Sequence, residues 1–570
     1  MTFGLILLAA TLSLDGSWAF RFEEGRAIEE VAKPDFKATD AMAVPGCYDM
    51  MPKWCHLRGT GLYRRTFTLD RAVDNAWLDV DGIGLRGKFM IDGRDLGVHP
   101  YPYARLELET GPLAAGEHTV FAALDNRLDW KTMKLAQPFY DFYFYGGIYR
   151  GMSLKTDNRR IFVRTRDYAT GTVEIEAVNF PQKNFDATLV FDSRTEVKVP
   201  FKNGRAMVRV PDFRLWSPDQ PNLHKVELSV SSESGKASAP PLSARFGIRT
   251  VEAKDRHIFL NGRPIFLKGV NRHEQCQEFG ATTTESQMVR DLQLLKGMNA
   301  NFIRGAHYQQ DQRFLDLCDE YGMLVWEESL GWQNGRWKVM PGNHDDIVDP
   351  EFVAGQIEET RQMVRNSFNH PSVIIFGFLN ECASYRKECK DLVDKLVQTI
   401  RTEDSGRLVT FACDNWKTDI CNENTDIISV NAYPGTIPME PGSPAELKEK
   451  VKARFDAAAE RFRKLYPDKP ILVSESGCGA FYGWHDPLAA NGSEEFQDEY
   501  LTDIFEAIWP NSDYVGLAIW QFANTNTHHR NNPRASHSGR MLGISISGIM
   551  DFQRNPKKAV ETVRKFFSQR

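Results

Sequence analysis

The sequence predicts two β-sandwiches followed by a (β/α)8 barrel, a multidomain fold of mixed β and α/β class. The chain has 570 residues, which is too long for one compact domain. Short strands separated by turns fill the first part, whereas apolar strand-like runs alternate with helix-like segments after Lys254. With 42% hydrophobic and 26% charged residues, the composition is that of a folded protein and excludes low-complexity disorder.

The two predicted sandwiches cover residues 14–156 and 157–252. The first contains short runs such as Trp77–Val80 and Lys88–Ile91, separated by turn signals at the spacing of a β-sandwich. In the second, apolar and polar residues alternate, as in Val173–Val178, which is the pattern of a strand with one buried face. The second sandwich is short enough to be immunoglobulin-like.

Residues 253–570 show the repeat of a (β/α)8 barrel. Eight strand candidates occur at Ile265–Leu267, Asn301–Ile303, Met323–Trp326, Val373–Phe376, Leu408–Phe411, Ile427–Val430, Ile471–Ser474 and Val515–Trp520. Helix-like segments occur at Glu285–Met298, Gln312–Tyr321, Phe352–Phe368, Lys387–Arg401, Ala445–Tyr466, Glu494–Trp509 and Pro556–Phe567. Because barrel enzymes carry their chemistry at the carboxyl ends of the strands, the polar residues that close each run are candidate site residues.

Two glutamates close apolar strands that face each other across the predicted barrel mouth. Glu381 follows Asn380 after strand 4, and Glu475 lies in a Ser-Glu-Ser-Gly stretch after strand 7. Two converging carboxylates are what cleavage of a glycosidic bond requires, and their mutual repulsion raises the proton affinity of one of them. The alternative from the strand pattern alone is a pair of solvated or salt-bridged glutamates.

Charge and cysteine content exclude several classes of protein. Lys and Arg total 70 against 76 Asp and Glu, a net charge of −6, and no basic tract occurs, so we expect no nucleic-acid partner. No run approaches 18 apolar residues, so we expect no integral membrane segment. The nine cysteines form no CxxC pair, and we expect buried free thiols for the closest ones, Cys382 with Cys389 and Cys413 with Cys421.

Residues 1–13 admit two interpretations. The apolar stretch from Phe3 to Leu8 resembles part of a signal peptide, although no basic residue precedes it. If it is a leader remnant, the protein is secreted or periplasmic; if it is an ordinary first segment, the protein is cytoplasmic. The sequence is also compatible with a homo-oligomer.

Three long motifs carry a family resemblance. Leu267–Glu274, Phe302–Tyr308 and Asn369–Glu381 resemble the signatures of glycoside hydrolase family 2, and the similarity extends from Leu14 to the last helix. The resemblance implies a sugar-binding jelly-roll sandwich, an immunoglobulin-like sandwich and a catalytic barrel. The substrate would be a small-molecule or oligosaccharide β-glycoside.

The resemblance also implies a role for each site residue. Glu381 would be the general acid/base, Glu475 the nucleophile, and Asn380 a ligand of the sugar 2-hydroxyl. The reaction would retain configuration, which requires the two carboxyl groups to lie about 5 to 5.5 Å apart. No phosphate-binding glycine loop, dinucleotide fingerprint or metal motif occurs, so we expect neither an organic cofactor nor a metal.

Further residues match the family pattern around these acids. The substrate-binding residues would be His307 and Asp141, which contact the sugar, Tyr433, which hydrogen-bonds the nucleophile, and Trp520, which stacks on the sugar. Asn271, His273 and Arg304 would support the barrel mouth, Arg304 as a buried cation paired with an active-site carboxylate. We expect the adjacent Glu327 and Glu328 to be structural.

The carboxyl-terminal part departs from the pattern in a way that affects the substrate. From Glu475 onward the chain looks most like β-glucuronidases, which bind the sugar carboxylate with an Asn-x-Lys-Gly element, but Ser545-Ile546-Ser547-Gly548 stands there. A carboxylate buried without its cation costs several kcal/mol, so we expect a neutral hexoside, galactoside first. The alternative is a β-glucuronidase or β-galacturonidase whose uronate site is rebuilt from basic residues of and after the loop 524–538: His528, His529, Arg530, Arg534, His537 and Arg540. An inactive carbohydrate-binding relative is the alternative of another class, and intact Glu381 and Glu475 argue against it.

Overall fold

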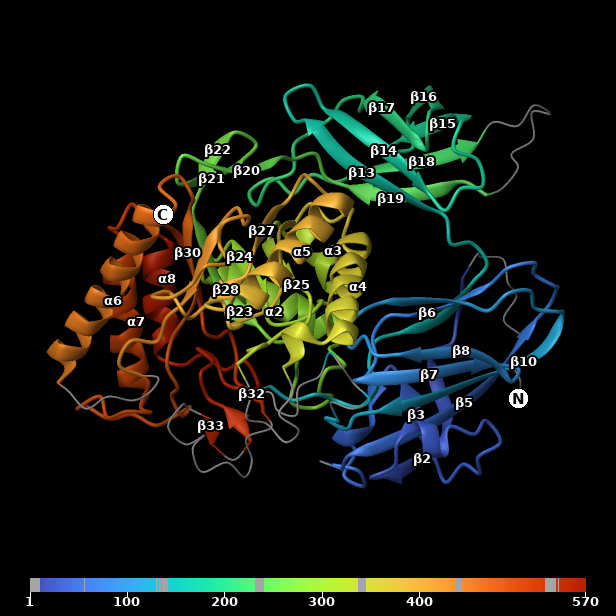
Figure 1. The fold of residues 1–570 in the computed structure, drawn as a ribbon, viewed down its shortest axis with the longest axis horizontal. Coiled ribbons are helices and arrows are strands. Elements are labelled where there is room, and N and C mark those ends of the chain that lie inside the picture. Colours follow the sequence, from blue (N-terminus) through green and yellow to red (C-terminus); the bar gives the residue numbers. More distant parts are fainter. Residues whose placement is uncertain are drawn as a thin grey trace.

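Two β-sandwiches lie beside a barrel of parallel strands surrounded by helices (Figure 1). The structure is a computed structural model. It describes residues 11–55, 57–129, 132, 135, 142–230, 240–336, 345–436, 443–527, 540–541 and 543–570. Among these residues, no helix has both the length and the apolar character needed to cross a membrane.

The first sandwich packs a four-stranded sheet, β1-β12-β6-β9, against a six-stranded sheet, β3-β2-β5-β10-β7-β8. Its core contains Trp18 and Phe89, both buried because side chains alternate between the two faces of each strand. The elements are β1 (Thr11–Ser13), β2 (Gly16–Glu24), α1 (Ile28–Val31), β3 (Asp40–Val44), β4 (Gly46–Cys47), η1 (Tyr48–Met50), β5 (Gly59–Leu69), β6 (Trp77–Val80), β7 (Arg86–Ile91), β8 (Arg94–His99), β9 (Leu106–Glu109), β10 (Gly116–Asp125), β11 (Gly147–Ile148) and β12 (Met152–Lys155). The strand β1 lies within residues 1–13 and pairs with β12, so sheet structure begins at least three residues before the sandwich start predicted at residue 14.

The second sandwich packs the sheet β13-β14-β17 against the sheet β16-β15-β18-β19. The alternation predicted for Val173–Val178 is observed, since Val173, Ile175 and Ala177 of β14 point into the core. The strands are β13 (Arg160–Asp167), β14 (Thr172–Val178), β15 (Phe185–Phe191), β16 (Thr195–Phe201), β17 (Arg205–Arg209), β18 (His224–Val230) and β19 (Leu242–Phe246). A small sheet of β20 (Val251–Lys254), β21 (His257–Leu260) and β22 (Arg263–Ile265) leads from this sandwich to the barrel.

The barrel is one parallel sheet with the order β27-β26-β25-β24-β23-β31-β30-β29-β28. Its two end strands, β27 and β28, are separated by Phe411 alone, so they are two pieces of one barrel strand and the ring has eight positions. The strands are β23 (Leu267–Arg272), β24 (Phe302–Gly305), β25 (Leu324–Glu328), β26 (Val373–Gly377), β27 (Leu408–Thr410), β28 (Ala412–Cys413), β29 (Ile428–Asn431), β30 (Ile471–Ser476) and β31 (Tyr514–Ile519). Each of the eight predicted strands overlaps a barrel strand, but the first, predicted at Ile265–Leu267, shares only Leu267 with β23, because Ile265 ends β22 of the small antiparallel sheet.

Helices cover the outside of the barrel. They are α2 (Glu285–Gly297), α3 (Gln312–Tyr321), α4 (Pro350–Asn366), α5 (Lys387–Glu403), α6 (Pro444–Leu465), α7 (Glu494–Ile508) and α8 (Ala559–Phe567), with a short η2 (Asp346–Val348) before α4. Helix α4 begins two residues earlier than predicted, because Asp349 caps it by accepting hydrogen bonds from the backbone of Glu351 and Phe352. The segment between β28 and β29, which the structure describes in full, contains no helix. A small sheet of β32 (Thr525–Asn526), β33 (Arg540–Met541) and β34 (Ile544–Ser545) follows the last barrel strand.

The first sandwich docks onto the barrel near the ends of β23 and β24. Arg150, which precedes β12, pairs with Glu274 through two hydrogen bonds of 3.0 Å, and both side chains are buried. The ring of Tyr103 stacks on that of Tyr308, with centroids 3.7 Å apart. This contact fixes the first sandwich against the end of the barrel that carries the candidate site residues.

Candidate active site

The candidate nucleophile, Glu475, lies in β30 and is almost fully buried, with 3% of its surface exposed. Both of its carboxylate oxygens accept a short hydrogen bond. The guanidinium of Arg304 donates to Oε1 at 2.6 Å, and the hydroxyl of Tyr433 donates to Oε2 at 2.6 Å. Because Arg304 always carries its charge, these contacts favour the ionised form of Glu475.

The pKa of Glu475 reflects opposing influences. Burial raises the pKa of this carboxyl to about 8, and the charge of Glu381 acts in the same direction. The charge of Arg304 and the hydrogen bond from Tyr433 lower the pKa and oppose this rise. The charge of Glu381 therefore acts on the pKa of Glu475. This agrees with the prediction that the two strand ends converge.

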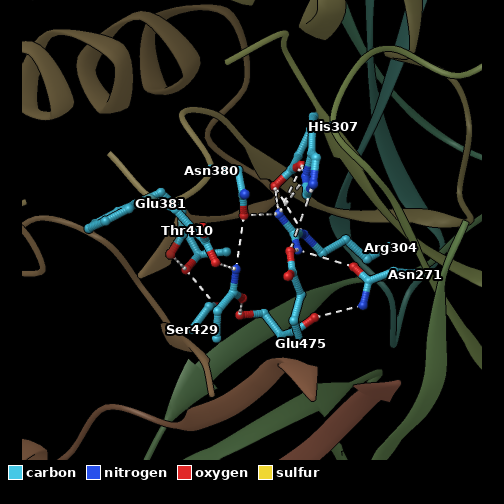
Figure 2. A network of polar contacts seen from close by, with 12 residues as sticks. Asn271, Arg304, His307, Asn380, Glu381, Thr410, Ser429 and Glu475 are labelled. Carbon is cyan, nitrogen blue, oxygen red and sulfur yellow. Dashed lines mark hydrogen bonds and ion pairs between the residues drawn. The ribbon is translucent and has the colours of Figure 1, made fainter. Parts of the chain in front are cut away.

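Arg304 is the centre of a buried polar network (Figure 2). Besides Glu475, it donates to Glu328 from Nε at 3.0 Å and from Nη2 at 2.8 Å, to Asn271 Oδ1 at 3.1 Å and to Asn380 Oδ1 at 2.9 Å. One guanidinium thus joins the carboxyl ends of β23, β25, β26 and β30. The buried cation predicted at Arg304 is thus paired with two carboxylates, those of Glu328 and Glu475.

Glu381 lies after β26 and takes part in a weaker set of contacts. Asn431 Nδ2 donates to Glu381 Oε1 at 3.1 Å, and Gln333 Nε2 donates to Glu381 Oε2 at 3.1 Å. Both donors are neutral amides. The backbone of Glu381 has a φ of 51°, an unusual conformation for a residue with a side chain, and one that often marks functional positions.

Asn380 and Asn431 connect the two glutamates. Asn431 Nδ2 also donates to Asn380 Oδ1, at 3.0 Å, so that oxygen accepts from Asn431 and Arg304 together. The amide nitrogen of Asn380 has no hydrogen-bond partner among the described residues, and Asn380 lines the cavity in front of the acids. This nitrogen is therefore available to donate to a bound molecule.

Two aromatic rings form another wall of the site. His307, after β24, stacks on Trp520, after β31, with ring centroids 5.3 Å apart and planes inclined by 10°. His307 Nδ1 lies 3.3 Å from Glu328 Oε2, and both rings line the cavity. His273 lies edge-on to Trp520 and contacts the hydroxyl of Tyr308, a position outside the cavity lining.

Asn271 connects neighbouring strands at the carboxyl end of the barrel. Its amide nitrogen donates to the backbone carbonyls of Ser474, Ala518 and Ile519, so it ties β23 to β30 and β31. Its oxygen accepts from Arg304. The supporting position predicted for Asn271 agrees with these contacts.

The cavity in front of the two glutamates has a volume of about 680 Å³. Such a volume lies in the range of about 300 to 1,000 Å³ that is typical of ligand pockets. Its lining residues are His307, Trp332, Gln333, Asn380, Glu381, Asp414, Trp416, Lys417, Asn431, Ala432, Tyr433, Pro434, Gly435, Lys450, Ala453, Arg454, Ala457, Glu475 and Trp520. The structure thus brings Glu381, Glu475, Asn380, His307, Tyr433 and Trp520 to one cavity.

Some predicted residues lie outside the described part of the chain. These are Asp141, the loop residues His528, His529, Arg530, Arg534 and His537, and the side chain of Arg540. Ser545 is buried and accepts a hydrogen bond from Gln521, and Ser547 is buried as well. Nearby, the ammonium group of Lys557 is surrounded by the carbonyl oxygens of Ala480, Asn524, Ile546 and Gly548.

The other acids and thiols have structural environments. Glu328 pairs with Arg304, and Glu327 accepts a hydrogen bond from the backbone of Gln310, as expected for structural residues. Within the described residues, only Asp316, Asp319 and His370 bring ligand atoms together as a metal site would, and Arg245 already pairs with Asp316 while His370 pairs with Asp319. The cysteines expected to be buried free thiols, at positions 382, 389, 413 and 421, are so.

Several cavity residues were given no role from the sequence. Asn431 and Asp414 are among the polar residues that follow the predicted strands and were candidates for that reason, and both line the cavity. Trp332 and Trp416 lie in loops after strands 3 and 5, four and three residues beyond the strand ends. Lys450 and Arg454 lie within α6, where no strand-end signal exists.

Comparison with known proteins identifies two family models along the chain. The model described as "Glycosyl hydrolases family 2, TIM barrel domain" matches residues 251–569, and the model "Glycosyl hydrolases family 2" matches residues 155–249. The chain is 25% identical to a β-glucuronidase of Paenibacillus borealis, in an alignment that covers 97% of this chain and 96% of that protein. It is 27% identical to the β-glucuronidase of Sus scrofa, in an alignment that covers 80% of this chain and 72% of that protein.

A solved structure is similar over nearly the whole chain. It is a family 2 β-galacturonidase from Eisenbergiella tayi bound to galacturonate, with a TM-score of 0.83 and 27% sequence identity. The match covers 98% of this chain and 97% of that one. The similarity therefore includes both sandwiches and the barrel.

Proposed function

Because this chain belongs to glycoside hydrolase family 2, and is a glycoside hydrolase, we propose that it is an exo-acting retaining β-glycosidase. The observation that carries the proposal is the unequal bonding of the two glutamates. Glu475 accepts from a guanidinium and a hydroxyl at 2.6 Å, whereas Glu381 accepts from two amides at 3.1 Å among the residues that the structure describes. The first environment suits a carboxylate nucleophile, and the second suits an acid that gives up and regains a proton.

The proposed reaction has two displacements at the anomeric carbon. In the first, a carboxylate oxygen of Glu475 attacks that carbon while Glu381 protonates the departing glycosidic oxygen, which releases the leaving group as an alcohol. In the second, Glu381 removes a proton from water as the water oxygen attacks the same carbon, and Glu475 leaves as a carboxylate. The sugar is released with its original configuration. This mechanism requires carboxyl groups about 5 to 5.5 Å apart.

The remaining cavity residues would hold the sugar against Glu475. The free amide nitrogen of Asn380 would donate to the 2-hydroxyl, and His307 would contact the ring hydroxyls. Trp520 offers an apolar face against which a sugar ring can stack, because the C–H groups of a sugar are partly apolar. Asp141 of the first sandwich would contact the outer hydroxyls.

A neutral hexoside, galactoside first, is the proposed sugar. Its support is the neutral pair Ser545 and Ser547 at the position of the Asn-x-Lys-Gly element, and the lack of a free charge on the two buried cations nearest to Glu475 and to these serines. Arg304 is committed to Glu328 and Glu475, and Lys557 to carbonyl oxygens. Ser545 and Ser547 are neutral, so a sugar carboxylate held there would lack an ionic partner.

A uronide is the second candidate, favoured by the comparisons. Two of the similar proteins are named β-glucuronidases, and the similar structure is a β-galacturonidase. Arg530 and Arg534 of the loop after the last barrel strand would supply the missing cation in that case.

The test is a side-by-side panel of nitrophenyl β-galactoside, β-glucuronide, β-galacturonide, β-glucoside and β-mannoside. We expect release of nitrophenol, the highest kcat/KM for the galactoside, and loss of release in Glu475→Ala. A clear preference for either uronide would contradict the neutral assignment. Unchanged turnover in Glu475→Ala would contradict the mechanism, and failure of the wild type on all five glycosides would contradict the proposed function.

A further inference from the structure

The cavity continues beyond the two glutamates into a basic region formed by the segment after strand 5 and by α6. Lys417, Lys450 and Arg454 line this end of the cavity, together with Trp416. The residues come from parts of the chain that supply neither glutamate. We call these four residues the basic end.

Arg454 is held in place by an aromatic ring and not by an ion pair with a described carboxylate. Its guanidinium lies 4.1 Å from the centroid of the Trp416 ring, a cation–π contact that limits the motion of the side chain. The ammonium of Lys417 lies 5.3 Å from the same ring. Among the described residues, no carboxylate pairs with Arg454, and its Nη1 atom is buried with no hydrogen-bond partner. Burial lowers the pKa of Arg454 to about 10, which still leaves it charged at neutral pH.

The acid that faces the basic end is already neutralised. Asp414 lies between this region and the catalytic pair, and it forms an ion pair with Arg336. Burial and the charge of Glu381 together raise the pKa of Asp414 to about 7. Asp414 is therefore paired with Arg336, and no described carboxylate pairs with Arg454.

The basic end lies on the leaving-group side of the site. In the proposed mechanism the sugar that is transferred contacts Glu475, His307 and Trp520, and the leaving group lies next to Glu381. Asp414 and Arg336 both interact electrostatically with Glu381, and Arg454 interacts with Asp414. Asp414 therefore lies near Glu381, and Arg454 lies near Asp414.

We propose that the basic end is a subsite for a leaving group that carries a carboxylate, such as a uronic acid residue. The planar guanidinium of Arg454 matches a carboxylate with two parallel hydrogen bonds, and Lys417 and Lys450 add positive charge around it. The cavity volume of about 680 Å³ leaves room for a second sugar residue beside the one that is cleaved off. This inference rests on the proposed function, since it assigns a substrate to the same site.

The test compares two disaccharides that share the transferred sugar. In one it is β-linked to glucose, and in the other to glucuronic acid, so only the charge of the leaving group differs. We expect wild-type kcat/KM to be about tenfold or more higher for the acidic disaccharide, and this ratio to fall about 10- to 100-fold in Arg454→Ala. Arg454→Lys keeps the positive charge but cannot form two parallel hydrogen bonds, so it should give an intermediate ratio.

Lys452→Ala is the matched control, because Lys452 lies on the same helix, is 63% exposed and pairs with Asp456. Its ratio should equal that of the wild type. An Arg454→Ala ratio equal to the wild-type ratio would overturn the proposal, as would a wild type that does not distinguish the two disaccharides. Circular dichroism of each variant checks that it is folded.

A binding measurement separates this proposal from the proposed function. Calorimetric titration of Glu475→Gln with each disaccharide needs no turnover, and adding Arg454→Ala should remove the preference for the acidic one. If the wild type hydrolyses neither disaccharide and Glu475→Gln still prefers the acidic one, the function fails and the subsite stands. If both are hydrolysed and no preference appears, the subsite fails and the function stands.

Discussion

Replacing Tyr433 with phenylalanine should slow the enzyme at neutral pH by about 10- to 150-fold. The hydroxyl of Tyr433 donates to Glu475 Oε2 at 2.6 Å in a buried site. A hydrogen bond to a charged group contributes about 1.5 to 3 kcal/mol, and about 1.4 kcal/mol corresponds to a factor of ten. The substitution removes one oxygen atom and leaves the aromatic ring in place, so the effect reports on this bond.

The same substitution should shift the pH dependence in a defined direction. The hydrogen bond from Tyr433 stabilises ionised Glu475 and lowers its pKa, so loss of this bond raises the pKa of Glu475 further. In the mechanism the nucleophile must be ionised. The rising limb of kcat/KM, which we expect near pH 8 from the pKa of Glu475, therefore moves to higher pH in the variant.

The assay is release of nitrophenol from the preferred aryl β-glycoside, measured over the pH range in which both proteins stay folded. Tyr321→Phe is the control, because the hydroxyl of Tyr321 makes no hydrogen bond to a described residue and lies outside the cavity. That variant should follow the wild-type profile. A Tyr433→Phe profile that coincides with the wild type, or that moves to lower pH, would refute the reasoning.

Three further substitutions test the site and its support. Asn380→Ala should lower kcat/KM about tenfold or more for the natural sugar and little for its 2-deoxy analogue, and an equal loss for both would contradict the contact with the 2-hydroxyl. Glu475→Gln should be more thermally stable than the wild type at high pH. Because the pKa of Glu475 is raised to about 8 in the folded protein, its contribution to the stability of the wild type is complete below about pH 4.5 and is lost as the pH rises through 8. The difference in Tm between the variant and the wild type should therefore grow over that pH range. A difference independent of pH would exclude this assignment. Arg150→Ala should reduce the free energy of unfolding by about 3 to 5 kcal/mol, because it leaves Glu274 buried and unpaired, whereas Arg166→Ala, at an exposed pair, should cost under about 1 kcal/mol in chemical denaturation. Equal effects of the two arginine substitutions would show that the buried pair has no special role.

The sequence predicted those parts of the fold that follow from periodicity. Most of the barrel strands contain a short run of buried apolar residues, and this pattern is visible without coordinates. Glu381 and Glu475 were found because each interrupts such a run at its carboxyl end. Asn431 has the same signal, and only the structure shows that its amide joins Glu381 to Asn380.

The cavity residues of α6 could not be predicted, because no local pattern in the sequence marks them. Arg454 lies ten residues inside α6, where an arginine is usually a solvated side chain. Its position in the cavity depends on how α6 packs against the barrel, and on the loop that places Trp416 beside it. Neither packing nor loop path is encoded in the spacing of residues along the chain.

The docking of the first sandwich also bears on how the protein is made. The sandwich leaves the ribosome before the barrel, and domains generally fold in that order. Arg150 is then already in place when Glu274, at the end of the first barrel strand, becomes buried. A barrel synthesised alone would have to bury that acid without its cation and expose the ring of Tyr308. We therefore expect a barrel made without the amino-terminal sandwich to be less stable than the barrel of the whole protein.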